Sequence, residues 1–66
     1  MSVLKVIEIL ANSKESWEDA TRSAVKEASK TVKNIRSVYL KEQSCVVDGA
    51  NITHFRVNVK VTFEVN

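Results

Sequence analysis

Residues 55 to 65 alternate between apolar and polar side chains without a break. A period of two is typical of a β-strand that buries one face and leaves the other polar. This alternation predicts one long, regular strand near the end of the chain. Its apolar face comprises Phe55, Val57, Val59, Val61, Phe63 and Val65, and its polar face comprises His54, Arg56, Asn58, Lys60, Thr62 and Glu64.

This strand is too long for the rest of the chain to cover. Taken from Ile52 to Val65, it runs about 45 Å. The only candidate helix, Ser16 to Lys33, reaches about 27 Å. A chain of 66 residues is also small for a stable core, and its single cysteine excludes an internal disulfide. We therefore expect one domain, residues 1–66, that associates with copies of itself.

The remaining elements predict an α+β fold with the order β-α-β-β. Val3 to Leu10 is rich in β-branched residues, and Ile35 to Val47 is a second, less regular strand. The segment from Asp48 to Asn51 contains the only glycine and predicts a hairpin loop. With the third strand in the centre, the expected architecture is a three-stranded antiparallel sheet curled around one helix.

The helix has a clear start and a narrow apolar stripe. Ser16 is the expected N-cap, and Asp19 is expected to reach back to its backbone as in a capping box. The middle of the stripe is alanine, which lets a helix approach a sheet closely. We expect the helix to pack on the apolar face of the third strand through its stripe, which comprises Trp17, Ala20, Ala24, Ala28, Thr31, Val32 and Ile35.

Three segments together resemble the dodecin family over nearly the whole chain. They are Lys5-Val6-Ile7-Glu8-Ile9, Ser16-Trp17-Glu18-Asp19-Ala20 and Val57-Asn58-Val59-Lys60-Val61-Thr62-Phe63. The resemblance implies β-α-β-β subunits in a hollow homododecamer. It also implies a binding and storage protein rather than an enzyme, with flavin (FMN or riboflavin) as the family ligand.

The usual flavin contacts of the family are replaced in this sequence. Ser37 stands where flavin-binding dodecins have a stacking tryptophan, with Tyr39 nearby, and Arg56 stands where they have a glutamine. Ile35-Arg36 and Glu42-Gln43 instead resemble a subgroup that includes a calcium dodecin. The resemblance therefore implies weakened flavin binding at Ser37, Tyr39 and Arg56, with calcium as an alternative ligand and Glu42 as a candidate metal ligand.

Other candidate residues have simpler structural interpretations. We expect Trp17 to pack, His54 to be a strand or interface residue, and Cys45 to be a buried or half-buried thiol. Arg56 could bind a phosphate or carboxylate, or pair with Glu42 or Glu64 of another subunit. No acid–base, nucleophile or phosphate-loop pattern indicates an enzyme.

Composition argues against two partners and leaves three functions open. The net charge is only +2 with dispersed basic residues, and no apolar run is long enough for a membrane. We thus expect no nucleic-acid or membrane partner, and the lone cysteine and lack of a signal-peptide pattern predict a cytoplasmic setting. The hypotheses are small-ligand binding and storage, a calcium-binding or other metal-binding shell, and a structural or protein-interaction assembly.

Overall fold

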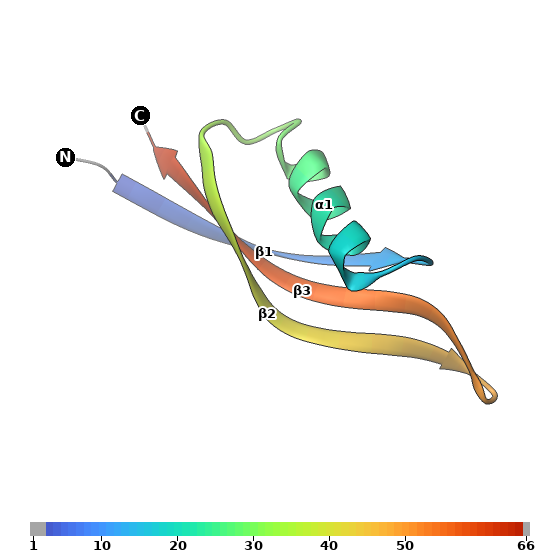
Figure 1. Ribbon diagram of the computed structural model, residues 1–66. Helices are drawn as coiled ribbons and strands as arrows, with labels where there is room; N and C mark the ends of the chain where they lie inside the picture. The colour runs from blue at the N-terminus through green and yellow to red at the C-terminus, as the bar shows by residue number, and fades with distance from the viewer. Residues whose placement is uncertain (1–2, 66) are drawn as a thin grey trace.

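The computed structural model describes residues 3–65 and has the element order expected from the sequence. β1 (Val3–Ser13) leads into α1 (Trp17–Ala28), and β2 (Ile35–Asp48) and β3 (Asn51–Val65) follow as a hairpin. The sheet order is β1-β3-β2, with both outer strands antiparallel to β3 (Figure 1). The α+β fold class and the central place of the third strand are confirmed.

α1 begins where the sequence predicts but ends earlier. Ser16 caps the helix by accepting a hydrogen bond from the Asp19 backbone N–H at 2.9 Å. The expected capping box is wrong in its second half, because the Asp19 carboxylate accepts from the Ser13 hydroxyl at 2.6 Å instead. The helix ends at Ala28 rather than Lys33, and Asn34 at φ 62° turns the chain into β2.

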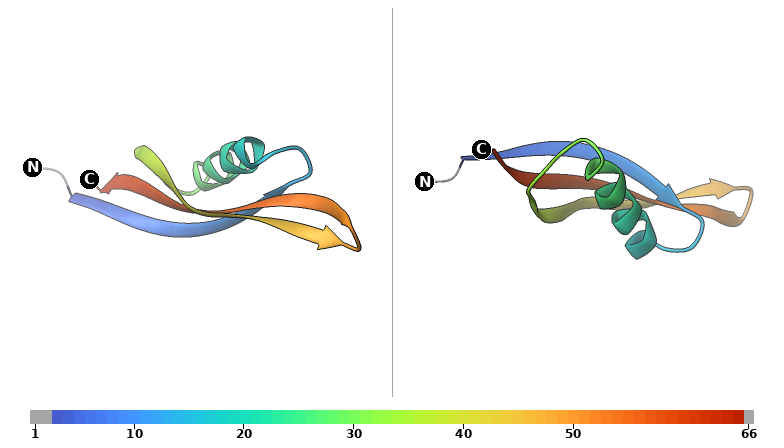
Figure 2. Two further views of the ribbon diagram at one scale, coloured as in Figure 1. Left: turned by 60° about the horizontal axis from the view of Figure 1, so that its bottom comes forward. Right: turned by 90° about the horizontal axis from the view of Figure 1, so that it is seen from above.

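The core between α1 and the sheet is built from small side chains. Ala20, Ala24 and Ala28 of the helix are buried, as are Val57, Val59 and Val61 of β3. Since alanine has only a methyl group, the helix axis can approach the central strand closely. The helix thus covers one face of the sheet, as predicted, and no other described element covers the opposite face (Figure 2).

A β-bulge explains why the alternation in β2 looked irregular. Leu40 pairs with Val59 on the helix side, the register then shifts, and Glu42 pairs with Asn58 on the other side. Strict alternation along this strand predicts that Leu40 and Glu42 share one face, and that prediction is wrong. The extra residue, Lys41, exchanges the faces and brings Gln43 and Cys45 to the helix side of the sheet.

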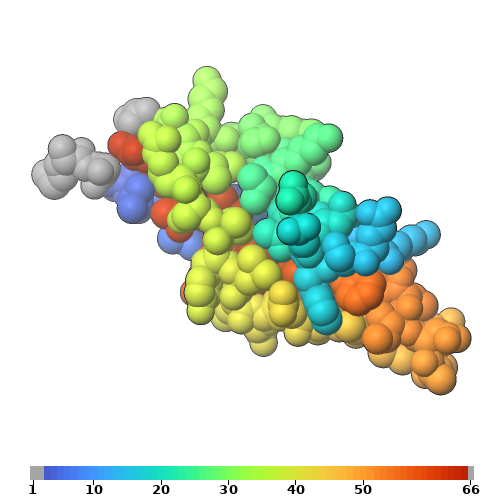
Figure 3. Space-filling view, viewed as in Figure 1, coloured from blue at the N-terminus to red at the C-terminus, as the bar shows by residue number. Residues whose placement is uncertain are grey.

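The chain is more extended than a compact domain of the same length and leaves large apolar side chains exposed. It measures 51 × 19 × 14 Å, and its radius of gyration is 13.4 Å, whereas a compact domain of this length has a value of roughly 11 Å. The hairpin end projects beyond the helix (Figure 3). Nine large apolar side chains are exposed, namely Val3, Leu4, Val6, Leu10, Tyr39, Leu40, Val47, Ile52 and Val65.

Candidate functional site

The sheet face turned away from α1, here called the outer face, holds most of the predicted site residues. The strand register places the following side chains on it: Glu8, Leu10 and Asn12 of β1, Arg56, Asn58, Lys60 and Thr62 of β3, and Ser37, Tyr39, Glu42 and Ser44 of β2. It combines charged groups with exposed apolar ones, and Leu10 is 69% exposed.

Two acidic side chains of the sheet are already paired with cations of the same chain. Lys41 donates to the Glu8 carboxylate at 3.5 Å, and Arg36 donates to the Glu64 carboxylate at 3.0 Å. A hydrogen bond from Asn58 and the nearby Lys41 ammonium hold the pKa of the Glu8 carboxyl below its ordinary value. Neither Glu8 nor Glu64 is therefore a free anion on this surface.

Glu42, the candidate metal ligand, has no such cation partner in the described part of the chain. One of its oxygens accepts a long hydrogen bond from the Asn58 Nδ2 at 3.4 Å. The Asn58 Oδ1 is buried and has no hydrogen-bond partner among residues 3–65. Glu42 and Asn58 are thus neighbours that each have an oxygen with spare hydrogen-bonding capacity, and the sequence alone did not point to Asn58.

Arg56 is exposed and is held by an amide rather than by a carboxylate. Its Nε donates to the Asn12 Oδ1 at 3.0 Å, which directs the guanidinium toward β1. Arg22 and Arg36, the other two arginines of the chain, both form ion pairs. In residues 3–65, Arg56 has none, and Asn12 is a positioning residue that the sequence did not reveal.

The three predicted ligand-binding residues share the outer face but do not meet within one chain. Ser37 lies opposite Thr62, Tyr39 opposite Lys60, and Arg56 opposite Ser44. Six residues along β3 separate the positions of Ser37 and Arg56, or about 20 Å. Tyr39, which is 65% exposed, lies between them. One ligand could contact Ser37 and Arg56 together only if they came from different copies.

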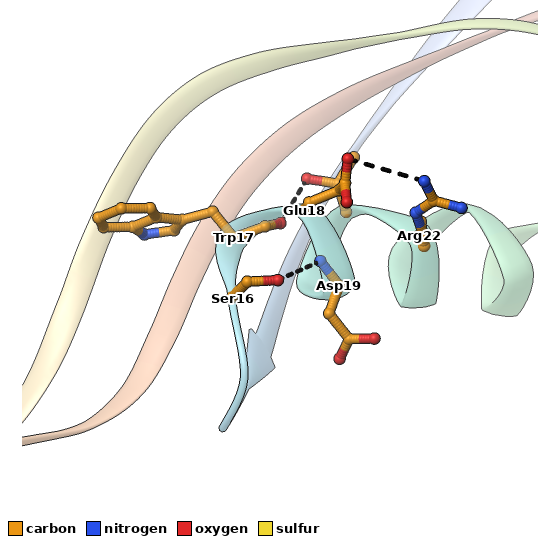
Figure 4. Close-up of polar contacts among 6 residues, drawn as sticks. Ser16, Trp17, Glu18, Asp19 and Arg22 are labelled. Atoms are coloured by element: carbon orange, nitrogen blue, oxygen red, sulfur yellow. Dashed lines mark hydrogen bonds and ion pairs between the residues drawn. The ribbon is translucent and has the colours of Figure 1, made fainter.

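Trp17 lies on the helix side of the sheet and is a packing residue, as expected. Its ring meets Phe55 edge to face with centroids 5.1 Å apart, and its Nε1 donates to the Ser44 carbonyl at 2.9 Å. Figure 4 shows the ring directed toward the sheet, while Glu18 and Arg22 form an ion pair further along the helix. Trp17 is thus not a relocated stacking group on the outer face.

His54 and Cys45 lie on β3 and β2, in the part of the hairpin that leads to its turn. The His54 Nδ1 is 3.1 Å from the Thr53 hydroxyl oxygen, and the Cys45 thiol is half-buried and unbonded. Within residues 3–65 there is no cluster of three or more His, Cys, Asp or Glu side chains that could hold a metal ion. Neither residue gains a partner that would make it a metal ligand or a nucleophile.

A single chain offers a surface rather than a cavity. No pocket is present in the part of the chain that the structure describes. No helix in residues 3–65 is both long and apolar enough to cross a membrane.

Comparison with known proteins identifies the family. The family model described as Dodecin matches residues 3–66. The chain belongs to the dodecin family. It is 41% identical over 64 residues to the calcium dodecin of Mycobacterium tuberculosis, covering 97% of this chain and 90% of that protein. The resemblance drawn from the sequence is thus confirmed.

Solved dodecins show the same fold. A crystal structure of calcium dodecin from Mycobacterium tuberculosis, described as a calcium-chelating antigen, matches with a TM-score of 0.86 and 38% identity, covering 98% of this chain and 93% of that one. A variant dodecin from Thermus thermophilus matches with a TM-score of 0.93 and 26% identity, covering 100% and 98%. This dodecin is a small binding protein of the family, with a calcium dodecin among its relatives.

Proposed function

We propose that this dodecin is a non-catalytic, self-associating protein that binds calcium on its outer face. The observation that carries the proposal is the pair of uncommitted oxygen ligands at Glu42 and Asn58. Carboxylate and amide oxygens are the ligands that calcium prefers. The 41% identity to a calcium dodecin supports the same ion.

Self-association follows from the shape of the chain and from the demands of calcium. The sheet overhangs its helix, and large apolar side chains are exposed at both ends and on the outer face. Calcium takes six to eight oxygen ligands, whereas one described chain gathers no group of three acidic or histidine ligands. We infer that a second copy completes the coordination, within the dodecamer that the family resemblance implies.

Calorimetric titration tests the calcium proposal. Calcium added to the wild-type protein should bind with measurable heat, and Glu42→Gln should weaken binding at least tenfold because a charged ligand becomes neutral. Glu15→Gln removes an exposed carboxylate from the connection before α1 and serves as the matched control, with no change expected. Equal binding by wild type and Glu42→Gln would exclude Glu42 as a ligand. Absence of binding by the wild type would refute calcium binding altogether.

Flavin is the second candidate ligand, and the exposed ring of Tyr39 favours it. An aromatic–base stack contributes about 1–3 kcal/mol in nucleic-acid systems, so serine in place of the family tryptophan should cost about fivefold or more in affinity for each ring. Riboflavin titration followed by fluorescence quenching measures this directly. Ser37→Trp should strengthen quenching, and Arg56→Gln should add to it at protein concentrations where sedimentation shows the variant to be assembled. Tight, stoichiometric quenching by the wild type, lost in Tyr39→Ala, would make flavin the first ligand instead.

A further inference from the structure

We propose that Arg56 of one copy pairs with Glu42 of a second copy, and that Arg56 of the second copy pairs with Glu42 of the first. This inference rests on the proposed self-association and names the contact that makes it specific in the calcium-free protein, in which no metal ion competes with Arg56 for the Glu42 carboxylate. It concerns the outer face, which no described element covers.

The first step is to find which charges of the sheet are unmatched. Glu8 pairs with Lys41, and Glu64 pairs with Arg36. Lys60 lies opposite Glu8 in the strand register, and its charge helps to lower the Glu8 pKa. Among the carboxylates and guanidiniums that the register places on the outer face within residues 3–65, this leaves Arg56 without a carboxylate and Glu42 without a cation.

The second step concerns the position of these two groups. Ser44 is opposite Arg56 and Glu42 is opposite Asn58, so Arg56 and Glu42 are diagonal neighbours across β2 and β3. Diagonal positions in a sheet are about 7–8 Å apart. They do not pair within the chain, because Arg56 donates toward Asn12 on β1 while Glu42 accepts from Asn58.

The third step is symmetry. A contact between two identical chains related by a two-fold axis is reciprocal, so a residue that meets a second residue is met by it in return. Arg56 and Glu42 lie close together on one face and carry opposite charges. Arg56 of each copy can therefore meet Glu42 of the other copy. Two outer faces related in this way would form two ion pairs at once.

The apolar part of the outer face gives such a contact its driving force. Leu10 is adjacent to the pair in the register, and Val6 and Tyr39 lie further along the same face. All three are more than half exposed in the single chain, at 69%, 55% and 65%. Burying them against a second copy would remove apolar surface from water, and the ion pairs would fix the register.

Charge reversal can distinguish a contact between copies from one within a chain. Arg56→Glu makes positions 42 and 56 both negative, and Glu42→Arg makes both positive. Each variant alone should need at least tenfold more protein for half-assembly, measured by sedimentation in EDTA. A 1:1 mixture, refolded together, should assemble like the wild type, and native mass spectrometry should show equal numbers of the two chains.

The double variant Glu42→Arg/Arg56→Glu should also assemble like the wild type. If it recovers assembly while the mixture does not, the pair lies within one chain and the proposal is wrong. If both single variants assemble normally, the proposal is wrong as well. A monomeric wild type would refute the proposed self-association itself, which separates that failure from the failure of this contact.

Two further sets of variants keep the test decisive. Glu18→Arg and Arg22→Glu reverse an exposed ion pair on the helix, so neither should alter assembly, and rescue by mixing them would show a non-specific charge effect. If the charge-reversed outer-face variants do not fold, Glu42→Gln and Arg56→Gln provide a neutral cycle. Each should weaken assembly, and the double variant should be no weaker than either alone, whereas additive losses would overturn the pairing.

Discussion

The two faces of β3 come from the same eleven alternating residues, 55 to 65, yet they differ in how fully the chain buries or hydrogen-bonds their side chains. On the helix face, Val57, Val59 and Val61 are fully buried against alanines. On the outer face, Asn58 keeps a buried oxygen without a partner among residues 3–65, and its hydrogen bond to Glu42 is long. The helix face holds the chain together, while the outer face leaves polar groups without partners among residues 3–65.

The sharpest way to test this contrast is to place a carboxylate on each face. Val59→Asp buries an unpaired charge where the native side chain is 0% exposed, which should cost about 4 kcal/mol or more. A domain of this size has a stability of about 3–10 kcal/mol, so the variant should not fold. Ser44→Asp puts the same group on the exposed outer face beside Arg56 and should fold normally. Circular dichroism on both variants checks the pair, and a folded Val59→Asp would contradict the one-sided core.

The closeness of helix and sheet can be tested by adding volume. Ala24 is 2% exposed, and leucine there should overpack the contact with β3 at a cost of about 1–3 kcal/mol. Leucine is a good helix former, so the loss cannot be attributed to helix propensity. Ser23→Leu adds the same side chain one residue earlier, on the exposed side of the helix. Chemical denaturation should show a loss for Ala24→Leu alone, and equal stability of both variants would argue against close packing.

Most of the fold could be predicted because it depends on patterns among residues that are close in sequence. The alternation from Phe55 to Val65, the alanine stripe and the Ser16 cap each act through neighbours in sequence, and each is present in the structure. The helix end could not be predicted, because Val32 continues the apolar stripe although the backbone leaves the helix at Ala28. The bulge at Lys41 could not be predicted either, because it depends on pairing with β3, which is distant in sequence.

The candidate site was harder to predict than the fold. Ser37, Tyr39, Arg56 and Glu42 do share one face, but their partners lie on other strands. Asn12 and Asn58 gave no signal in the sequence, because an isolated asparagine indicates neither a ligand nor a positioning residue. Which charges remain unmatched depends on the register, and the register follows from a bulge that the pattern alone did not reveal.

The smallest predicted effect concerns Glu8, the outer-face carboxylate that the chain does satisfy. The hydrogen bond from Asn58 and the Lys41 charge lower the pKa of this carboxyl in the folded state. A lowered folded-state pKa means stability that is present above the unfolded-state pKa and is lost as pH falls through the folded-state value. Acidification should therefore lower the melting temperature less in Glu8→Gln than in the wild type.

Melting curves at neutral pH and at about pH 3, below the ordinary pKa of a glutamate, measure this difference. Because the Glu8 side chain is open to solvent, the effect should be smaller than that of either core variant and should shrink in high salt. Glu15→Gln, which removes an exposed carboxylate outside the sheet, should show the wild-type acid loss. An unchanged acid loss in Glu8→Gln would mean that the Asn58 and Lys41 contacts do not favour its charged form. The outer face would then be uncommitted at Glu8 as well as at Glu42, and the contrast with the helix face would be greater than the structure indicates.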